Sequence, residues 1–397
     1  MKKLSFLFLS ILFPMVAFAD AVEINGVYYT LNTDDHSAAV ASNPNKYTGE
    51  VTIPSVVTYE EVAYDVKAIQ DTAFFDCGAL TSITVPSSVT SIGYMAFLNC
   101  ESITSLSIPE SVTTLGDYAF DNCRGITTLT IPQSITAIGT GVFCRCVGLT
   151  SLTIPNSVTS IGDQSFSGCK RLTSVTIPES VISIGNTAFY MCDSLASVTI
   201  QEGVTSIGNT AFSGCYALSS ITVPNSVTSI GSSVFSSCYC LTTVSIGSGV
   251  TYIGRNVFAS CNALKDVYCY AENVPSTHEK VFYSSKVSDN VTLHVPAASV
   301  EAYKSATPWN TFKNIVAIDE ETGIADVRAK AVQMQFKGGK LNVHGIADGT
   351  RVSLYTIDGN LAGTATVRNG VATFGATLRT GTPAIVRIGH KSVKVVF

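Results

Sequence analysis

One stretch of the sequence decides the fold: Leu149-Thr-Ser-Leu152-Thr-Ile154-Pro155-Asn-Ser-Val158-Thr-Ser-Ile161-Gly162-Asp-Gln-Ser-Phe166-Ser-Gly-Cys169. In its first part, the apolar Leu152 and Ile154 alternate with the polar Ser151 and Thr153. This alternation is typical of a short strand with one buried face, and it directs the two polar side chains outward. Pro155 has no backbone N–H and therefore ends the hydrogen-bond ladder of the strand.

The second part of the stretch carries apolar residues spaced three apart. Val158 and Ile161 form one such pair, and Phe166 and Cys169 form another. A spacing of three places side chains on one face of a helical turn, and Gly162 permits a tight bend between the pairs. The whole stretch predicts a unit made of a strand, a turn and a short helix or 3₁₀ segment.

This unit is repeated along most of the chain with a period of 23 residues. Cysteine follows phenylalanine by three residues in nine consecutive units, whose phenylalanines stand at positions 74, 97, 120, 143, 166, 189, 212, 235 and 258. An Ile-Gly or Leu-Gly pair recurs at the same step, from Ile92-Gly93 to Ile253-Gly254. One unit cannot bury its apolar face alone, so the units must stack and share a continuous core. The predicted fold class is an α+β repeat solenoid.

The consensus of the unit is Leu-x-x-Leu-x-Ile-Pro-x-x-Val-x-x-Ile-Gly-x-x-x-Phe-x-x-Cys. It resembles the BspA-like leucine-rich repeat of Treponema- and Bacteroides-type surface proteins, over roughly residues 48 to 318. One departure from the general leucine-rich repeat is that Pro-x-Ser-Val stands where an Asn usually follows the strand. The resemblance implies a leucine-rich repeat array that binds matrix proteins or other cells.

The N-terminal residues 1–19 are typical of a secretory signal peptide. Lys2 and Lys3 precede an apolar run, and Ala17-Phe18-Ala19 is a small-x-small cleavage site. The apolar run is shorter than the roughly 20 residues needed to span a membrane. We therefore expect a secreted or cell-surface protein whose mature chain begins at Asp20 and has no membrane span.

Breaks in the 23-residue period suggest the domain limits. After the signal peptide we expect an N-terminal cap (20–70), the regular solenoid (71–265), a C-terminal cap (266–318), a polar linker (319–330) and a separate module (331–397). Caps are needed because the terminal core of an open solenoid would otherwise face water. Trp309, the only tryptophan of the chain, is expected to seal the last turn.

Residues 331–397 carry short alternating runs separated by hairpin signals such as Asp358-Gly359 and Asn369-Gly370. Regularly spaced short strands of this kind predict a small all-β sandwich. The stretch Val352-Ser-Leu-Tyr355-Thr-Ile357-Asp-Gly359, with the final Lys391-Ser-Val-Lys394-Val-Val, resembles the C-terminal sorting domain of Bacteroidota. That resemblance implies type IX export, with the export machinery as a partner and the exterior of the outer membrane as the destination.

Composition excludes several classes of partner. Only 13% of the 397 residues are charged, the net charge is −5, and no basic run occurs. Nucleic acids and anionic membranes are bound by clustered Lys and Arg, so neither is an expected partner.

Twelve cysteines in an exported chain raise the question of disulfides. Nine of them occupy the inward column behind the phenylalanines, where parallel side chains suit a packed ladder better than bridges. We expect buried free thiols there, with disulfides and a metal ladder as the alternatives. Cys144 and Cys240 lie off this register and are predicted to be exposed thiols.

The sequence holds no recognisable catalytic constellation. The five histidines, at positions 36, 278, 294, 344 and 390, are scattered and not spaced as metal ligands. No phosphate-binding loop or nucleophile elbow occurs, and no base recurs beside the serines. We expect a protein that is not an enzyme and that uses no cofactor and no metal.

The outward strand residues are the candidate binding surface, because the pleat must expose them. They are Ser151, Thr153, Ser174, Thr176, Ser197, Thr199, Ser220 and Thr222. Such a regular hydroxyl sheet suits many weak contacts with an extended partner. The strand columns are expected to contain no aromatic platform, and Tyr216 and Tyr239 share another column just after the cysteines.

Three functions fit this surface. The first is adhesion or macromolecular recognition, with a host or bacterial surface protein or glycan as partner. The second is a structural spacer without a specific ligand, and the third is a glycan-binding accessory protein.

Overall fold

The computed structural model describes residues 21–318 and, in the C-terminal part, 333–337, 340–344, 349–356, 361–375, 383–388 and 391–396. The predicted signal peptide (1–19) and linker (319–330) lie outside the described residues. The chain forms two compact units that divide after Ile318. Each unit is described by itself below.

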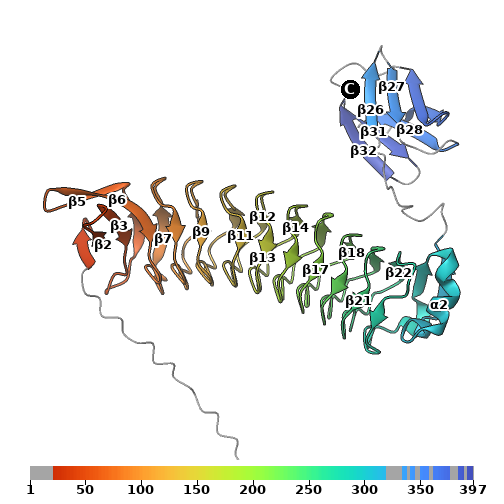
Figure 1. Ribbon diagram of the computed structural model, residues 1–397, viewed down its shortest axis with the longest axis horizontal. Coiled ribbons are helices and arrows are strands. Elements are labelled where there is room, and N and C mark those ends of the chain that lie inside the picture. The colour runs from red at the N-terminus through yellow and green to blue at the C-terminus, as the bar shows by residue number, and fades with distance from the viewer. Residues whose placement is uncertain are drawn as a thin grey trace, which may run out of the picture. The chain divides into compact units, whose positions relative to one another are not determined.

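The first unit is a solenoid of stacked coils that share two columns of parallel strands. Figure 1 shows the coils side by side, from orange at the N-terminal end to teal at the other. Neighbouring coils pair in register 23 residues apart, as in Ser160 with Ser183 and Ile161 with Ile184. The predicted solenoid of stacked 23-residue units is therefore confirmed.

The long-strand column lies where Leu152 and Ile154 predicted it. Its strands are β7 (Leu80–Thr84), β10 (Thr128–Thr130), β12 (Ser151–Thr153), β14 (Ser174–Ile177), β16 (Ser197–Ile200), β18 (Ser220–Val223), β20 (Thr243–Ile246), β22 (Asp266–Cys269), β24 (Thr292–Val295) and β25 (Asn314–Ala317). β7 pairs with a strand of the N-terminal segment, and the other strands form three separate ladders, β10–β12, β14–β16 and β18–β20–β22–β24–β25. The column is interrupted between them, so it is not one continuous sheet.

The short-strand column is more continuous. It consists of β8 (Ser91–Ile92), β9 (Thr114–Leu115), β11 (Ala137–Ile138), β13 (Ser160–Ile161), β15 (Ser183–Ile184), β17 (Ser206–Ile207), β19 (Ser229–Ile230), β21 (Tyr252–Ile253) and β23 (Ser276–Thr277). The strands from β11 to β23 make one seven-stranded parallel sheet.

Strands of the N-terminal segment pair directly with strands of both columns. Its strands are β1 (Ala21–Ile24), β2 (Val27–Asn32), β3 (Ser37–Val40), β4 (Gly49–Thr52), β5 (Val56–Tyr59) and β6 (Val62–Ile69). The sheet β1–β2–β3–β6 continues into β8 and β9, while β4 pairs with β7. The first coil therefore meets strands of the N-terminal segment rather than water.

The predicted short helix is absent from the regular coils and is replaced by consecutive turns. In one coil, Gln164 and Gly168 have left-handed φ angles of 58° and 72°, which interrupt a helical run. The N–H groups of Gln164 and Phe166 donate to Asn186 and Ala188 of the next coil, at 2.9 and 2.8 Å. Because these bonds run between coils, the prediction of a strand, turn and short helix is corrected to a β-solenoid with little helix.

The core is a continuous stack of aromatic rings. The nine column phenylalanines and Phe282 stack with ring centroids 4.8–5.7 Å apart and planes within 13° of each other. Tyr47 packs against Phe74 at the N-terminal end. At the other end, Trp309 and Phe312 meet Phe282 edge-on. Trp309 is fully buried there.

The glycine of each Ile-Gly pair serves a different purpose from the predicted bend. A β-carbon on Gly162 would lie 2.8 Å from the carbonyl carbon of Gly139 in the preceding coil. A β-carbon would likewise lie 2.4–2.7 Å from the nearest atom of the preceding coil at each of the glycines 93, 116, 185, 208, 231 and 254. Glycine is required here because the backbones of successive coils approach closely.

Within residues 21–318, the only helical segments lie in the C-terminal part. They are α1 (Val287–Asn290), η1 (Ala297–Ser299), α2 (Val300–Ser305) and η2 (Trp309–Thr311). No helix in the described part of the chain has the length and apolar character needed to cross a bilayer.

The second unit contains two antiparallel sheets. One has the order β26 (Gln333–Lys337), β27 (Lys340–His344), β30 (Val371–Gly375), and the other has the order β29 (Leu361–Thr366), β28 (Arg351–Thr356), β31 (Pro383–Ile388), β32 (Lys391–Val396). Buried residues of both sheets share one core: Leu341, Val343, Val352, Leu354, Val367, Ala372, Phe374 and Val386. The small all-β sandwich remains a prediction, because several connections lie outside the described residues.

Candidate functional site

The eight candidate residues of the strand face are all exposed. In β14, for example, Ser174 and Thr176 are exposed while Val175 and Ile177 between and after them are buried. Within the described residues, none of the eight side chains makes a hydrogen bond to the protein. Their hydroxyl groups are therefore available to solvent or to a ligand.

Other hydroxyl columns of the same coils are used to hold the stack together. Ser157 Oγ donates to Ile135 O at 2.8 Å, and Thr159 Oγ1 donates to Thr136 O at 3.0 Å. Equivalent residues repeat these bonds along the array, including Ser111, Ser134, Ser180, Ser226, Thr113, Thr205, Thr228 and Thr251. The serine and threonine hydroxyl groups of the coils thus form two sets. One set makes hydrogen bonds between coils, and the other, on the strand face, is free.

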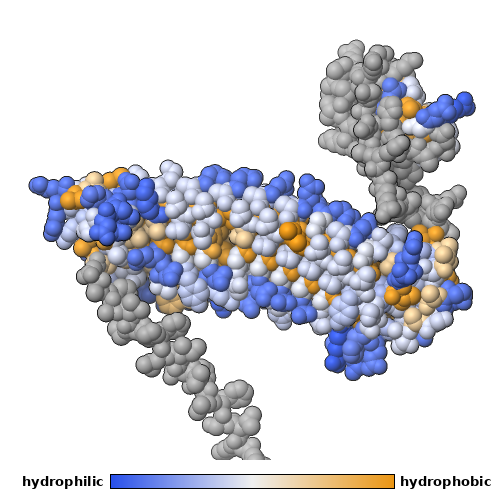
Figure 2. All heavy atoms as spheres, in the orientation of Figure 1, coloured by the Kyte–Doolittle hydropathy of each residue, from blue (hydrophilic) through white to orange (hydrophobic). Residues whose placement is uncertain are grey.

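The surface of the solenoid matches this composition. In Figure 2 its visible side is mostly pale, between strongly hydrophilic and strongly hydrophobic, with scattered blue patches and a broken line of orange along the middle of the solenoid. A face of this kind offers hydroxyl groups and few charges.

The column cysteines are buried free thiols, as predicted. Each column thiol from Cys100 to Cys261, the off-register Cys144 and Cys240 excepted, donates to the carbonyl oxygen of a phenylalanine in the preceding coil, at 3.1–3.4 Å. In Cys169, for instance, Sγ lies 3.3 Å from Phe143 O. Burial raises the pKa of Cys261 to about 12, so the thiol stays protonated and able to donate.

The same hydrogen bond continues beyond the last cysteine of the column. Ser285 occupies the equivalent place, and its Oγ donates to Phe258 O. The sequence hid this relation because Ser285 follows Cys261 by 24 residues instead of 23.

The two off-register cysteines behave differently from each other. Cys240 is exposed, as predicted, but Cys144 is buried, so the prediction of an exposed Cys144 is wrong. Cys144 lies beside the ion pair between Asp121 and Arg145, in which Nε and Oδ1 are 2.9 Å apart. Burial, and then the carboxylate of Asp121, raise the pKa of Cys144 to about 12.

The long-strand column carries an aromatic pair near its C-terminal end, contrary to the expectation that the strand columns contain no aromatic platform. Tyr268 of β22 pairs in register with Ser245 and with His294 of β24. The rings of Tyr268 and His294 stack with centroids 4.2 Å apart. His294 Nε2 lies 2.9 Å from Asp266 Oδ1. The pair was missed because Tyr268 and His294 are 26 residues apart, outside the regular period.

Tyr216 and Tyr239 form a second aromatic feature outside the strand face. Their rings stack with centroids 5.3 Å apart and planes 4° from parallel. Tyr239 is 49% exposed. The shared column predicted for these two residues is confirmed.

Within the described residues, no group of three or more His, Cys, Asp or Glu side chains is arranged to hold a metal ion. Some acidic and basic side chains form pairs between coils, such as Arg124 with Glu101 and Lys170 with Asp193.

Three solved structures illustrate what this chain is similar to. A leucine-rich cell surface protein of Faecalibacterium prausnitzii is 25% identical, with 76% of this chain and 95% of that chain covered and a TM-score of 0.47. A leucine-rich repeat protein of Bacteroides ovatus is 21% identical, with coverages of 75% and 100% and a TM-score of 0.47. The leucine-rich repeat protein of T. pallidum is 28% identical, with coverages of 50% and 90% and a TM-score of 0.44.

A search among curated proteins finds no match. The sequence pattern of the BspA type leucine-rich repeat region matches six copies, over residues 67–195 and 182–303. These residues make up more than half of the chain and coincide with the stacked coils. The chain therefore belongs to the family of BspA-type leucine-rich repeat proteins.

Proposed function

We propose that the protein is a non-catalytic recognition or adhesion protein that acts outside the cell and contacts a surface protein of a host or a neighbouring bacterium. The observation that carries this proposal is the free hydroxyl set of the strand face. Eight side chains from Ser151 to Thr222 are exposed and make no hydrogen bond within the described protein, whereas the hydroxyl groups of neighbouring columns are used in stacking.

The spacing of the strand face favours an extended partner. Parallel strands lie about 4.8 Å apart, so corresponding hydroxyl groups recur at that distance from coil to coil. Each contact is weak, but contacts made along one partner reinforce one another.

A triple lysine variant of the strand face tests the proposal. The mature chain and a variant with Thr153, Thr176 and Thr199 replaced by Lys are compared for binding to immobilised fibronectin, laminin and collagen. We expect the variant to lose at least tenfold in affinity, because three charges must be desolvated in the contact.

The matched control places three lysines elsewhere on the same coils. Gln164, Ile182 and Met191 are exposed on other columns, and their replacement by Lys is expected to leave binding unchanged. If the strand-face variant binds as well as the unchanged chain, the recognition surface lies elsewhere.

A structural spacer is the second candidate function, and the ladders between coils favour it. Thiol, hydroxyl and backbone bonds join each coil to the next along the array. These bonds make a rod that holds its length without any ligand. Absence of binding of the unchanged chain to every surface and glycan tested would favour this function.

We propose that residues 1–19 direct secretion and that residues 331–397 engage a type IX export machinery. The resemblance of residues 352–359 and 391–396 to the Bacteroidota sorting domain supports the second part. Deleting residues 331–397 should leave the solenoid folded, because the two units have separate cores, but trap it short of the cell exterior. Normal surface display of the truncated chain would exclude this export route.

A further inference from the structure

The regular period breaks near residue 260, and a surface cavity that is open to solvent lies at this point. Phe282 follows Phe258 by 24 residues, and the helix α1 follows it. Beside α1 lies a hollow of about 500 Å³, within the range of small-molecule sites, about 300–1,000 Å³. Its polar lining includes Thr242, Asn262, Lys265, Lys286, Asp289 and Asn290.

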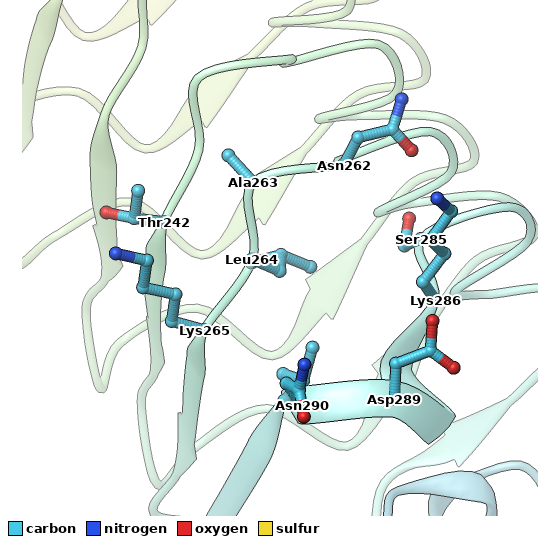
Figure 3. A pocket seen from close by; sticks show the side chains of 10 residues that line it. Thr242, Asn262, Ala263, Leu264, Lys265, Ser285, Lys286, Asp289 and Asn290 are labelled. Carbon is cyan, nitrogen blue, oxygen red and sulfur yellow. The ribbon is translucent and has the colours of Figure 1, made fainter.

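The lining residues reach the cavity from two sides. Figure 3 shows Thr242 and Lys265 on one side and Asn262, Lys286 and Asp289 on the other. Two lysines and one aspartate give the charged groups of the lining a net charge of +1 (2 − 1) at neutral pH.

The polar groups of the lining differ in whether the protein already uses them. Thr242 Oγ1 donates to Ser219 O at 3.0 Å, and Asp289 accepts a hydrogen bond from Ser288. Within the described residues, neither Lys265 nor Lys286 has an ion-pair partner. The amides of Asn262 and Asn290 likewise make no side-chain hydrogen bond there. Two ammonium groups and two amides are therefore available to a ligand.

An exposed aromatic ring, Tyr239, lies one coil before Asn262, which lines the cavity. One face of Tyr239 stacks on Tyr216 of the preceding coil. The equivalent position of the following coil is Asn262, which lines the cavity and carries no ring. Tyr239 therefore ends the stacked pair on the side of the cavity, and the ring is 49% exposed.

We propose that this cavity binds an anionic saccharide, a sugar that carries a carboxylate. The C–H face of a sugar ring is attracted to the electron-rich face of an aromatic ring, which Tyr239 supplies. Amides such as those of Asn262 and Asn290 both donate and accept hydrogen bonds, as sugar hydroxyl groups require. Lys265 and Lys286 provide the positive charge for the carboxylate. The site is separate from the eight residues of the strand face and does not depend on their role.

Matched pairs of oligosaccharides test the proposal on the mature full-length chain. Sialyllactose is compared with lactose, and trigalacturonate with galactotriose, by titration calorimetry. We expect an acidic member of at least one pair to bind, and its neutral partner to bind at least tenfold more weakly. Binding should weaken as salt concentration rises, because charge pairs near the surface are screened.

Substitutions then test which side chains bind the sugar. Tyr239→Ala and the double variant Lys265→Gln, Lys286→Gln should each lose at least tenfold in affinity, whereas Tyr239→Phe keeps the ring and should retain binding. Lys280→Gln removes an exposed lysine outside the cavity and is the matched control. Circular dichroism confirms that each variant is folded.

Three outcomes would overturn the proposal. They are no binding of either acidic sugar, equal binding of acidic and neutral members, or unchanged affinity in folded Tyr239→Ala. Because the strand-face variant keeps Tyr239 and the lysines, it should still bind the acidic sugar, so failure of one proposal does not imply failure of the other.

Discussion

The regular coils and the C-terminal end of the solenoid enclose the same core in different ways. In the coils, phenylalanine rings lie face to face within 13° of parallel, so every ring needs a next ring to cover it. At the end, Trp309 and Phe312 meet Phe282 at 71° and 85°. The edges of Trp309 and Phe312 thus pack against Phe282, in one of the arrangements that aromatic pairs prefer. The difference shows that parallel stacking extends a solenoid and perpendicular packing ends it.

The largest test of this comparison removes one ring from the middle of the stack. Phe166→Ala should lower the free energy of unfolding by about 3–5 kcal/mol, because it leaves a cavity between two flat rings. Phe74→Ala at the N-terminal end should cost less, because one of its two ring neighbours is Tyr47 of the irregular N-terminal segment, tilted by 40°, instead of a parallel phenylalanine. Urea midpoints of both variants measure the difference. A larger loss at Phe74 would contradict the nearest-neighbour description.

A second test concerns how closely coils approach. Gly162→Ala places a β-carbon 2.8 Å from backbone of the preceding coil, so the stack must shift at a cost of about 1–3 kcal/mol or more. Gly78 is the matched control, since a β-carbon there would meet its nearest atom at 3.9 Å. Thermal denaturation should show a lower Tm for Gly162→Ala and little change for Gly78→Ala. An equal change in Tm for the two variants would mean that the close approach of the coils does not require glycine at position 162.

A third test compares thiol with hydroxyl as the donor to the phenylalanine carbonyl. Cys192 donates to Phe166 O at 3.3 Å, as Ser285 does to Phe258 O near the C-terminal end. Cys192→Ala should cost about 1 kcal/mol through the lost hydrogen bond and contacts. Cys192→Ser keeps a donor and should cost less. If serine is the more destabilising replacement by urea denaturation, packing of sulfur outweighs the hydrogen bond.

The smallest effect is a difference in reactivity between thiols. Iodoacetamide should label only Cys240 in the native chain at pH 8.5, because the reactive species is the thiolate. Burial raises the pKa of Cys144 and Cys261 to about 12 and that of Cys269 to about 11. Denatured protein should be labelled at all twelve positions. Rapid native labelling of Cys144, detected by mass spectrometry, would show that its coil opens.

The period of the sequence predicts whatever depends on equivalent residues in neighbouring coils. The inward columns of Phe166 and Cys169 and the outward positions of Ser151 and Thr153 follow from a constant step of 23, because identical units stack in register. The helix expected from the spacing of Phe166 and Cys169 is wrong, since that spacing fits a helical turn and a chain of β-turns alike. Only the hydrogen bonds to the next coil distinguish the two.

The features that sequence reasoning missed depend on irregular contacts. Cys144 is buried next to an ion pair whose members, Asp121 and Arg145, are 24 residues apart. Tyr268 and His294 belong to one strand column although 26 residues separate them. The cavity beside α1 arises where the regular step of 23 is lost. Such contacts do not repeat along the sequence, so they can be identified only from the structure.

The close match between neighbouring coils has a consequence for how the length of the molecule evolves. Removal of residues 156–178 would join Pro155 to Glu179, and Ser180, Ile184 and Phe189 would take the places of their counterparts in the lost coil. Every remaining coil would still form hydrogen bonds with the coils on either side of it. The solenoid would shorten by the distance between two stacked phenylalanine rings. Gene duplication and deletion can thus change the reach of the protein in fixed steps, while the ends that close it stay the same.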